Sequence, residues 1–201
     1  PDVKIDLDTD TLELDGKPLL IQKHLYLMLN KPSGVLSAAR DPKQPTVLDL
    51  VPETYRRSGL FPAGRLDKDT EGFVLITDDG EFAHSILSPK HHVPKTYHAR
   101  IDGPLTEQMV EEFAAGVVLE DGVTCNPAQL SVLENGEQPL CQVILTQGMY
   151  HQVKRMFLAF GRRVLWLKRT AIGGLLLDNA LQPGESREIL DKEIKMLLGK
   201  I

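Results

Sequence analysis

Short apolar runs that end at turn residues constrain this fold more than any other feature of the sequence. Residues 25–29 form one such run, which ends at the turn-forming residues 30–34. Residues 73–77 form a second run, which ends at Asp78–Asp79–Gly80. Apolar runs of this length, bounded by Gly, Pro, Asn and Asp, are typical of buried strands. Further strands are predicted at residues 95–101 and 164–167, and as several short strands within residues 117–145.

Helices are predicted between these strands. The clearest one follows Thr106, a residue type that caps helices, and ends at Gly116 after Ala115. Others are predicted at residues 47–51, 82–87 and 150–160, and from Asp191 to Leu198. The helices and strands do not alternate as regular βαβ units. The sequence therefore predicts an α+β fold with a mixed, mostly antiparallel sheet and flanking helices.

The composition narrows the class of protein. Of the 201 residues, 42% are hydrophobic and 25% are charged, which is typical of a folded globular protein. The two cysteines, Cys125 and Cys141, are too few for a disulfide scaffold, and no apolar run reaches the roughly 20 residues of a membrane span. No signal-peptide pattern opens the chain. We therefore expect a cytoplasmic protein without membrane association, and, because no long apolar stripe is visible, a monomer.

The opening segment, residues 1–16, is acidic. Acidic and apolar residues alternate up to Asp15–Gly16, which is typical of a short strand followed by a turn. The end of an acidic linker is an equally good interpretation. We therefore divide the chain into an N-terminal extension, residues 1–24, and one main domain, residues 25–201.

Basic residues are distributed unevenly. The net charge of −5 by itself argues against nucleic-acid binding, but residues 139–177 contain none of the 28 Asp and Glu residues. An acid-free basic segment in an otherwise acidic protein suits a polyanionic partner. The alternative is a solvated helix face and strand edge with no such role. The basic residues of this segment are Lys154, Arg155, Arg162, Arg163, Lys168 and Arg169.

Three acidic residues lie close together before the second apolar run. Asp67, Asp69 and Glu71 begin like a calcium-binding loop, but Asp78 occupies the position of the usual bidentate Glu, and a strand follows where a helix is required. A second interpretation is a carboxylate nucleophile or base, kept ionised by nearby cations. A third is a turn in which an Asp side chain only bonds the local backbone.

Four ordered motifs resemble those of RNA pseudouridine synthases. Residues 64–72, Gly-Arg-Leu-Asp-Lys-Asp-Thr-Glu-Gly, are similar to the family signature, and residues 29–34 resemble its opening strand and loop. Lys95–Thr96–Tyr97 and residues 147–157 resemble the second and third motifs, and residues 172–175 fit the segment that follows. The resemblance covers about residues 26–188. The sequence of residues 150–157 is most similar to that of the RsuA branch, which modifies small-subunit ribosomal RNA.

The resemblance implies an activity and its partners. The family isomerises uridine to pseudouridine in RNA and needs neither a cofactor nor a metal. We expect the substrate to be one uridine of small-subunit (16S) ribosomal RNA, presented as naked RNA or as a ribonucleoprotein intermediate. The RsuA branch normally begins with an RNA-binding S4 domain, which these 201 residues do not show, so residues 25–201 would be the catalytic domain. Alternatives are large-subunit ribosomal RNA as substrate, a small nucleoside or sugar phosphate as substrate, and a non-catalytic RNA-binding or ribosome-assembly module.

The resemblance also assigns roles to residues. It makes Asp67 the catalytic carboxylate, Tyr97 the platform that stacks on the flipped base, and Lys154 the cation that pairs with Asp67. Arg65 would contact the backbone of the flipped nucleotide or fill the gap it leaves, and His151 would be either structural or an RNA contact. The remaining basic residues are candidate phosphate contacts, namely Arg155, Arg162, Arg163, Lys168 and Arg169.

Overall fold

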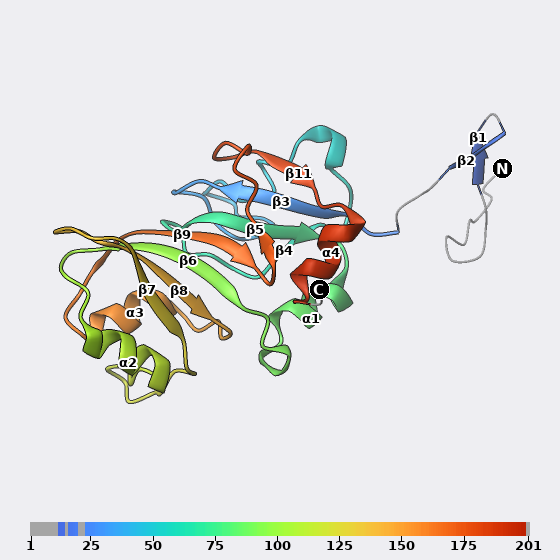
Figure 1. Cartoon of the computed structure of the whole chain (residues 1–201). Coiled ribbons are helices and arrows are strands. Elements are labelled where there is room, and N and C mark those ends of the chain that lie inside the picture. Colours follow the sequence, from blue (N-terminus) through green and yellow to red (C-terminus); the bar gives the residue numbers. More distant parts are fainter. Residues whose placement is uncertain (1–11, 15, 20–22, 200–201) are drawn as a thin grey trace.

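A single nine-stranded sheet organises the protein. The computed structural model describes residues 12–14, 16–19 and 23–199. Along the sheet the strand order is β11-β3-β5-β9-β6-β8-β7, with β4 beside β5 and β10 beside β9 (Figure 1). The strands are β3 (Tyr26–Lys31), β4 (Phe61–Ala63), β5 (Glu71–Thr77), β6 (Lys95–Ile101), β7 (Gln129–Glu134), β8 (Leu140–Leu145), β9 (Val164–Ile172), β10 (Leu175–Leu176) and β11 (Ser186–Glu188).

Helices and shorter elements complete the fold. The α-helices are α1 (Gly80–Leu87), α2 (Glu107–Ala115), α3 (Gln152–Leu158) and α4 (Asp191–Leu197), and short 3-10 turns lie at Glu53–Tyr55 and Pro89–His91. A separate two-stranded hairpin joins β1 (Leu12–Leu14) to β2 (Lys17–Leu19). The predicted short strand corresponds to β1 and its turn to Gly16, whereas Asp15 and the residues before Leu12 lie outside the described residues. In the described part of the chain no helix is long and apolar enough to cross a membrane.

The sheet is mixed and mostly antiparallel, as predicted. Only β5 and β9 run parallel, at the pairs Glu71–Lys168 and Gly72–Arg169. The two backbones approach closely at Gly72, where an added Cβ would lie 2.2 Å from the Arg169 carbonyl oxygen. Gly72 also has a φ of 100°, a conformation that L side chains rarely adopt. Glycine at this position therefore lets β9 lie directly beside the strand that follows the Asp67 loop.

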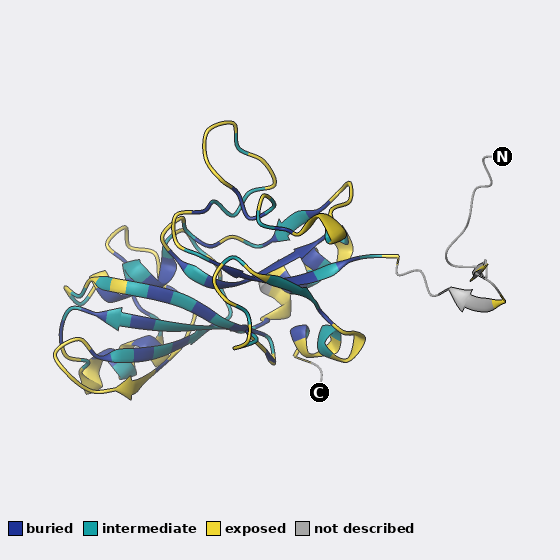
Figure 2. Ribbon diagram, turned by 90° about the horizontal axis from the view of Figure 1, so that it is seen from above, coloured by how far each residue is buried: buried dark blue, intermediate teal, exposed yellow. Residues whose placement is uncertain are grey.

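The burial of each strand follows from what covers it. Leu27, Met28 and Phe73 are all fully buried, because β3 and β5 are covered on both faces by separate apolar clusters. In β8 only alternate residues are buried, because one face packs on the core and the other does not (Figure 2). Burial is therefore nearly continuous along β3 and β5, whereas it alternates along β8.

The helices cover the two halves of the sheet. Helices α2 and α3 lie at the β6–β8 end, and α1 and α4 at the other (Figure 1). The rings of Phe113 in α2 and Phe157 in α3 pack 5.2 Å apart between their centroids. This apolar contact fixes α3, and with it the residues at its N-terminus, against the sheet.

Most predicted elements are confirmed, and two details are wrong. Helix α2 has the predicted bounds and is capped by Thr106, whose Oγ1 accepts from the Met109 N–H. The helix predicted at residues 47–51 is absent; Asp49 instead accepts from the Thr46 N–H and holds a turn. At the last helix the N-cap is Leu190 rather than Asp191, because the Glu193 carboxylate accepts the Leu190 N–H.

Candidate active site

The loop that carries Asp67 is a tight turn between β4 and β5. The Asp67 carbonyl accepts from the Thr70 N–H at 3.1 Å, which closes the turn through the backbone. The Asp67 side chain therefore remains available, and it is 26% exposed. One interpretation of the sequence was a turn in which an Asp side chain only bonds the local backbone. The arrangement of Asp67 differs from it, because its carboxylate contacts the side chains of Lys154 in α3 and of His151 just before α3.

A buried lysine holds the backbone of this loop in place. Lys31 at the end of β3 is fully buried, and its Nζ donates to the carbonyl oxygens of Pro32 (3.0 Å), Lys68 (3.1 Å) and Thr70 (2.7 Å). Burial lowers the pKa of Lys31 to about 8, and the acidic side chains of the loop oppose this change. Two of the three acceptors, the carbonyls of Lys68 and Thr70, lie in the turn that follows Asp67, so Lys31 positions the loop that carries the carboxylate.

The Lys154 side chain in α3 and the His151 side chain just before it face Asp67. Lys154 Nζ lies 3.2 Å from one Asp67 oxygen and 2.6 Å from an Asp69 oxygen, and His151 Nε2 lies 3.4 Å from the other Asp67 oxygen. Burial opposes a charged Lys154, but its hydrogen bonds to Asp69 and Asp67 raise the pKa of Lys154 above its usual value. The hydrogen bond from Lys154 also lowers the pKa of Asp69.

The backbone at His151 is unusual. Its φ of 49° places this non-glycine residue in the left-handed region, immediately before α3. The imidazole stacks on the Tyr150 ring at a centroid separation of 3.8 Å. Strained residues of this kind are held where the surrounding structure requires them, commonly at functional sites. Here the strain directs the imidazole at Asp67.

Asp67 opens onto a cavity of about 660 Å³. The cavity extends from the Asp67 loop to β6 and β9 and is closed on one side by residues 147–153. Tyr97 on β6 lines it together with Asp67, Arg65 and His151. Four residues singled out from the sequence, although distant along the chain, therefore line one cavity, with Lys154 bound directly to its carboxylate.

The six basic residues of the acid-free segment do not form one open basic surface. Arg155 pairs with Asp121, and Arg163 pairs with Asp102 at 2.9 Å while remaining 78% exposed. The Arg162 Nε donates to the Pro104 carbonyl at 3.4 Å, and Lys168 is partly buried on β9.

Arg169 departs most from the expectation of an exposed phosphate contact. It is only 4% exposed and lines the cavity. Successive residues of a strand point to opposite faces of the sheet. Arg169 is buried because it lies on the inward-facing side of β9. The acid-free segment therefore supplies both cavity residues and surface residues.

Sequence reasoning missed Lys31 and Lys95 as individual residues. Both are charged residues at the end of a predicted strand, and a lysine there is usually solvated. A lysine that lies one residue after five apolar residues and precedes a proline was the available signal for Lys31. For Lys95 the first position of a strand gave no comparable signal.

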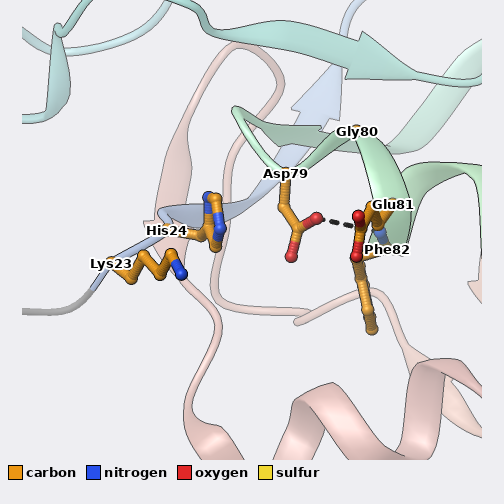
Figure 3. A pocket seen from close by; sticks show the side chains of 6 residues that line it. All are labelled: Lys23, His24, Asp79, Gly80, Glu81 and Phe82. Atoms are coloured by element: carbon orange, nitrogen blue, oxygen red, sulfur yellow. Dashed lines mark hydrogen bonds between the residues drawn. The ribbon is translucent and has the colours of Figure 1, made fainter. Parts of the chain in front are cut away.

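A second hollow lies away from this site. Figure 3 shows it at the start of α1, with a volume of about 620 Å³. Asp79 beside it accepts from the Phe82 N–H at 2.9 Å and so caps α1. None of the candidate residues lines this hollow. The Asp67 cavity is therefore the candidate active site.

Comparison with known proteins gives a consistent result. The sequence pattern of the family described as RNA pseudouridylate synthase matches residues 25–159. YtzG of Bacillus subtilis (strain 168), described as an uncharacterized RNA pseudouridine synthase, is 45% identical over 199 residues, covering 98% of this chain and 83% of that protein. The ribosomal small subunit pseudouridine synthase A of Escherichia coli (strain K12) is 45% identical over 184 residues, covering 90% of this chain and 77% of that protein.

A solved structure agrees with the sequence matches. A crystal structure of a pseudouridylate synthase resembles this fold with a TM-score of 0.80 and 37% identity, covering 97% of this chain and 83% of that one. The family match spans more than half of the chain, and both named relatives are 45% identical to this chain over most of its length. This chain therefore belongs to the RNA pseudouridine synthase family, of the RsuA type, whose members isomerise uridine to pseudouridine in RNA.

Proposed function

We propose that this chain isomerises one specific uridine of small-subunit (16S) ribosomal RNA, with Asp67 as the catalytic carboxylate. The observation that carries the proposal is that Asp67, paired with Lys154 and His151, opens onto the same cavity as Tyr97. Its volume of about 660 Å³ is in the range of small-molecule sites and suits one flipped nucleoside.

The reaction begins with extrusion of the uridine from the RNA stack, which costs a few kcal/mol, roughly. Tyr97 offsets part of this cost by stacking on the uracil. The N1–C1′ bond then breaks and its electron pair stays with the uracil. Asp67 either adds to C1′ through a carboxylate oxygen or assists loss of the C2′ proton to give a glycal. After the uracil turns over, C5 bonds to C1′ while the Asp67–C1′ bond breaks or, in the glycal route, while C2′ regains its proton. The C5 proton is then lost and N1 gains a proton.

Lys154 holds the Asp67 carboxylate in place before the reaction. Its ammonium lies 3.2 Å from one carboxylate oxygen and so fixes the position from which Asp67 acts in either route. His151 approaches the other oxygen and restricts the orientation of the carboxylate. Arg65 lines the cavity and is exposed, so it reaches the backbone of the flipped nucleotide or the gap it leaves.

The surface basic residues contact phosphates around the cavity. Arg163 and Arg162 are the best placed of these, since Arg163 is largely exposed and the Arg162 guanidinium makes one long hydrogen bond. Arg155 and Lys168 contribute where RNA displaces their present contacts, and each phosphate contact adds to the salt dependence of binding.

The choice of small-subunit ribosomal RNA rests on the relatives named for that substrate. The substrate is naked RNA or a ribonucleoprotein intermediate, the enzyme is a cytoplasmic monomer, and residues 25–201 form the catalytic domain. All strands from β3 to β11 in the sequence belong to one sheet, which supports this domain assignment.

Mapping of pseudouridine tests the proposal. Small- and large-subunit ribosomal RNA transcripts, with and without bound ribosomal proteins, are incubated with the chain and with Asp67→Asn. Pseudouridine is located by its chemical adduct and the resulting reverse-transcription stops. We expect one new site in the small-subunit RNA that disappears with Asp67→Asn, while RNA affinity is retained.

Asp69→Asn is the matched control. Asp69 also pairs with Lys154 but is 68% exposed, so its substitution should leave most activity. A site only in large-subunit RNA would refute the substrate assignment. RNA binding without pseudouridine would favour the assembly module, and turnover of free uridine or its monophosphate would favour a small-molecule enzyme. Unchanged turnover by Asp67→Asn would remove Asp67 from the catalytic role.

A further inference from the structure

Two buried cations line the Asp67 cavity without a carboxylate partner. Lys95 on β6 is 8% exposed and Arg169 on β9 is 4% exposed. Their strands pair antiparallel, with Tyr97 opposite Arg169. Among the described residues neither cation takes part in a salt bridge: Lys95 makes one long hydrogen bond, to the Ile86 carbonyl at 3.4 Å, and Arg169 donates through Nε to the Phe73 carbonyl at 2.8 Å. We call this pair the cationic wall.

Unpaired polar atoms are concentrated at the same cavity. In the part of the chain that the structure describes, three buried side-chain polar atoms lack a hydrogen-bond partner. Two of them, Thr70 Oγ1 and Arg169 Nη2, belong to residues that line the cavity. Native proteins leave few such groups unpaired, and each one calls for an explanation.

The cationic wall is unfavourable for folding. Burial, reinforced by the charge of Arg169, lowers the pKa of Lys95 to about 8. An uncompensated buried charge destabilises a protein strongly. Asp67, the acidic residue in the cavity lining, does not neutralise these two charges, because it contacts Lys154 and His151 instead. A group retained at a cost to stability beside a carboxylate and an aromatic platform indicates a role in the reaction.

The chemistry of the bond cleavage supplies that role. When the N1–C1′ bond breaks, its electron pair leaves with the uracil, and the negative charge spreads over N1 and the carbonyl oxygens. C1′ of the ribose becomes electron-deficient. It regains electron density either from an Asp67 oxygen or from the C2′–H bond when the C2′ proton is lost. From these positions we infer that Lys95 and Arg169 stabilise the departing uracil anion, while Asp67 serves the ribose at the other part of the cavity. This inference rests on the proposed function of the cavity.

Such stabilisation acts mainly on the transition state. Neutral uracil interacts weakly with the two cations, whereas the anion interacts strongly in a site that excludes water. The charge is in place before the reaction, so no reorganisation is needed when it acts. Loss of one cation should therefore lower the rate of the chemical step without weakening the binding of the RNA.

Lys95→Met tests this expectation. Methionine has a similar length and no charge, so the variant should fold with unchanged or higher thermal stability. We expect the single-turnover rate to fall about 10²–10³-fold, the effect of removing one preorganised charge-stabilising group. The RNA Kd should stay unchanged. Lys95→Arg, which keeps the charge, should recover most of the rate. Lys192→Met, the same change at an exposed lysine on α4, is the control and should have no effect.

A binding measurement separates electrostatics from packing. Barbiturate is a pyrimidine that is anionic at neutral pH, and uracil is its neutral counterpart. By ligand-observed NMR, the wild-type chain should bind barbiturate at least about tenfold more tightly than uracil, which corresponds to about 1.4 kcal/mol. Lys95→Met and Arg169→Met should lose this preference. A residue that only supports the cavity wall would weaken both ligands equally.

The outcomes are distinguishable. A wild-type chain that forms no pseudouridine in any RNA would refute the proposed function and the inference with it. An active wild type together with an active Lys95→Met would refute the inference alone. Barbiturate that binds no better than uracil, including the case in which neither binds, would also overturn it.

Discussion

Lys31→Met is the most informative substitution for the architecture of the site. The Lys31 ammonium is fully buried and donates to three carbonyl oxygens, two of which lie in the turn that follows Asp67. Methionine fills the same space but leaves all three acceptors without this donor. The substitution therefore tests whether one buried charge holds the loop that carries the carboxylate.

The magnitude follows from two opposing contributions. Three hydrogen bonds to a charged group contribute about 1.5–3 kcal/mol each. Burial lowers the pKa of Lys31 from 10.5 to about 8, which opposes folding by about 3 kcal/mol at 1.36 kcal/mol per pH unit. The difference leaves a net loss of about 1.5–6 kcal/mol in the free energy of unfolding at pH 7. A displaced loop should also lower the rate of pseudouridine formation about 10²-fold.

The pH dependence gives a second, independent readout. Because the pKa of Lys31 is lower in the folded state, the unfolded chain binds more protons between about pH 8 and pH 10.5. The Lys31 contribution to wild-type stability therefore rises with pH across this window, and Lys31→Met lacks it. The stability gap between the two proteins should widen from pH 7 to pH 10.

Urea unfolding at several pH values and single-turnover assays at pH 7 measure these effects. Lys68→Met is the control: Lys68 belongs to the same loop but is exposed, with its Nζ on the Gln44 side chain at 2.8 Å. Its loss should cost well under about 1 kcal/mol. A Lys31→Met protein as stable and as active as the wild type, or a stability gap that narrows toward pH 10, would refute the reasoning.

Three further predictions concern other residues. Tyr97→Phe should retain stacking and Tyr97→Leu should weaken the flipped state by about 1–3 kcal/mol, so equal single-turnover rates for the two variants would show that stacking is not what the ring contributes. Lys154→Met should lower turnover by removing the cation 3.2 Å from Asp67, with recovery in Lys154→Arg and no change in melting temperature large enough to explain the loss. Cys125 and Cys141 are buried, and burial raises the pKa of Cys141 to about 11; alkylation at pH 8, followed by mass spectrometry, should therefore modify them only after unfolding.

The pattern of the sequence was sufficient for the local elements. Helix α2 is capped by Thr106 at its start and by Gly116 at its end, as predicted, because capping and termination depend on neighbouring residues only. Strand β6 has the predicted bounds for a similar reason, as its alternating residues are visible in the chain itself. The helix predicted at residues 47–51 failed where a side chain, Asp49, bonded the backbone of Thr46 and stabilised a competing turn.

The family and the candidate residues Asp67, Tyr97 and Lys154 were also available from ordered motifs in the sequence. Their spatial relation was not. Asp67 and Lys154 are 87 positions apart, and they meet because Phe113 and Phe157 seat α3 against the sheet while Lys31 fixes the Asp67 loop.

Only the tertiary structure decided which basic residues belong to the cavity. Lys154, Arg163 and Arg169 are equivalent as charges along an acid-free segment. Folding places Lys154 on the carboxylate, Arg163 in solvent beside Asp102, and Arg169 inside the sheet next to Lys95. The physical reason is that capping and strand alternation act between neighbours in the chain, whereas burial and charge pairing depend on segments brought together only when β5, β6 and β9 assemble.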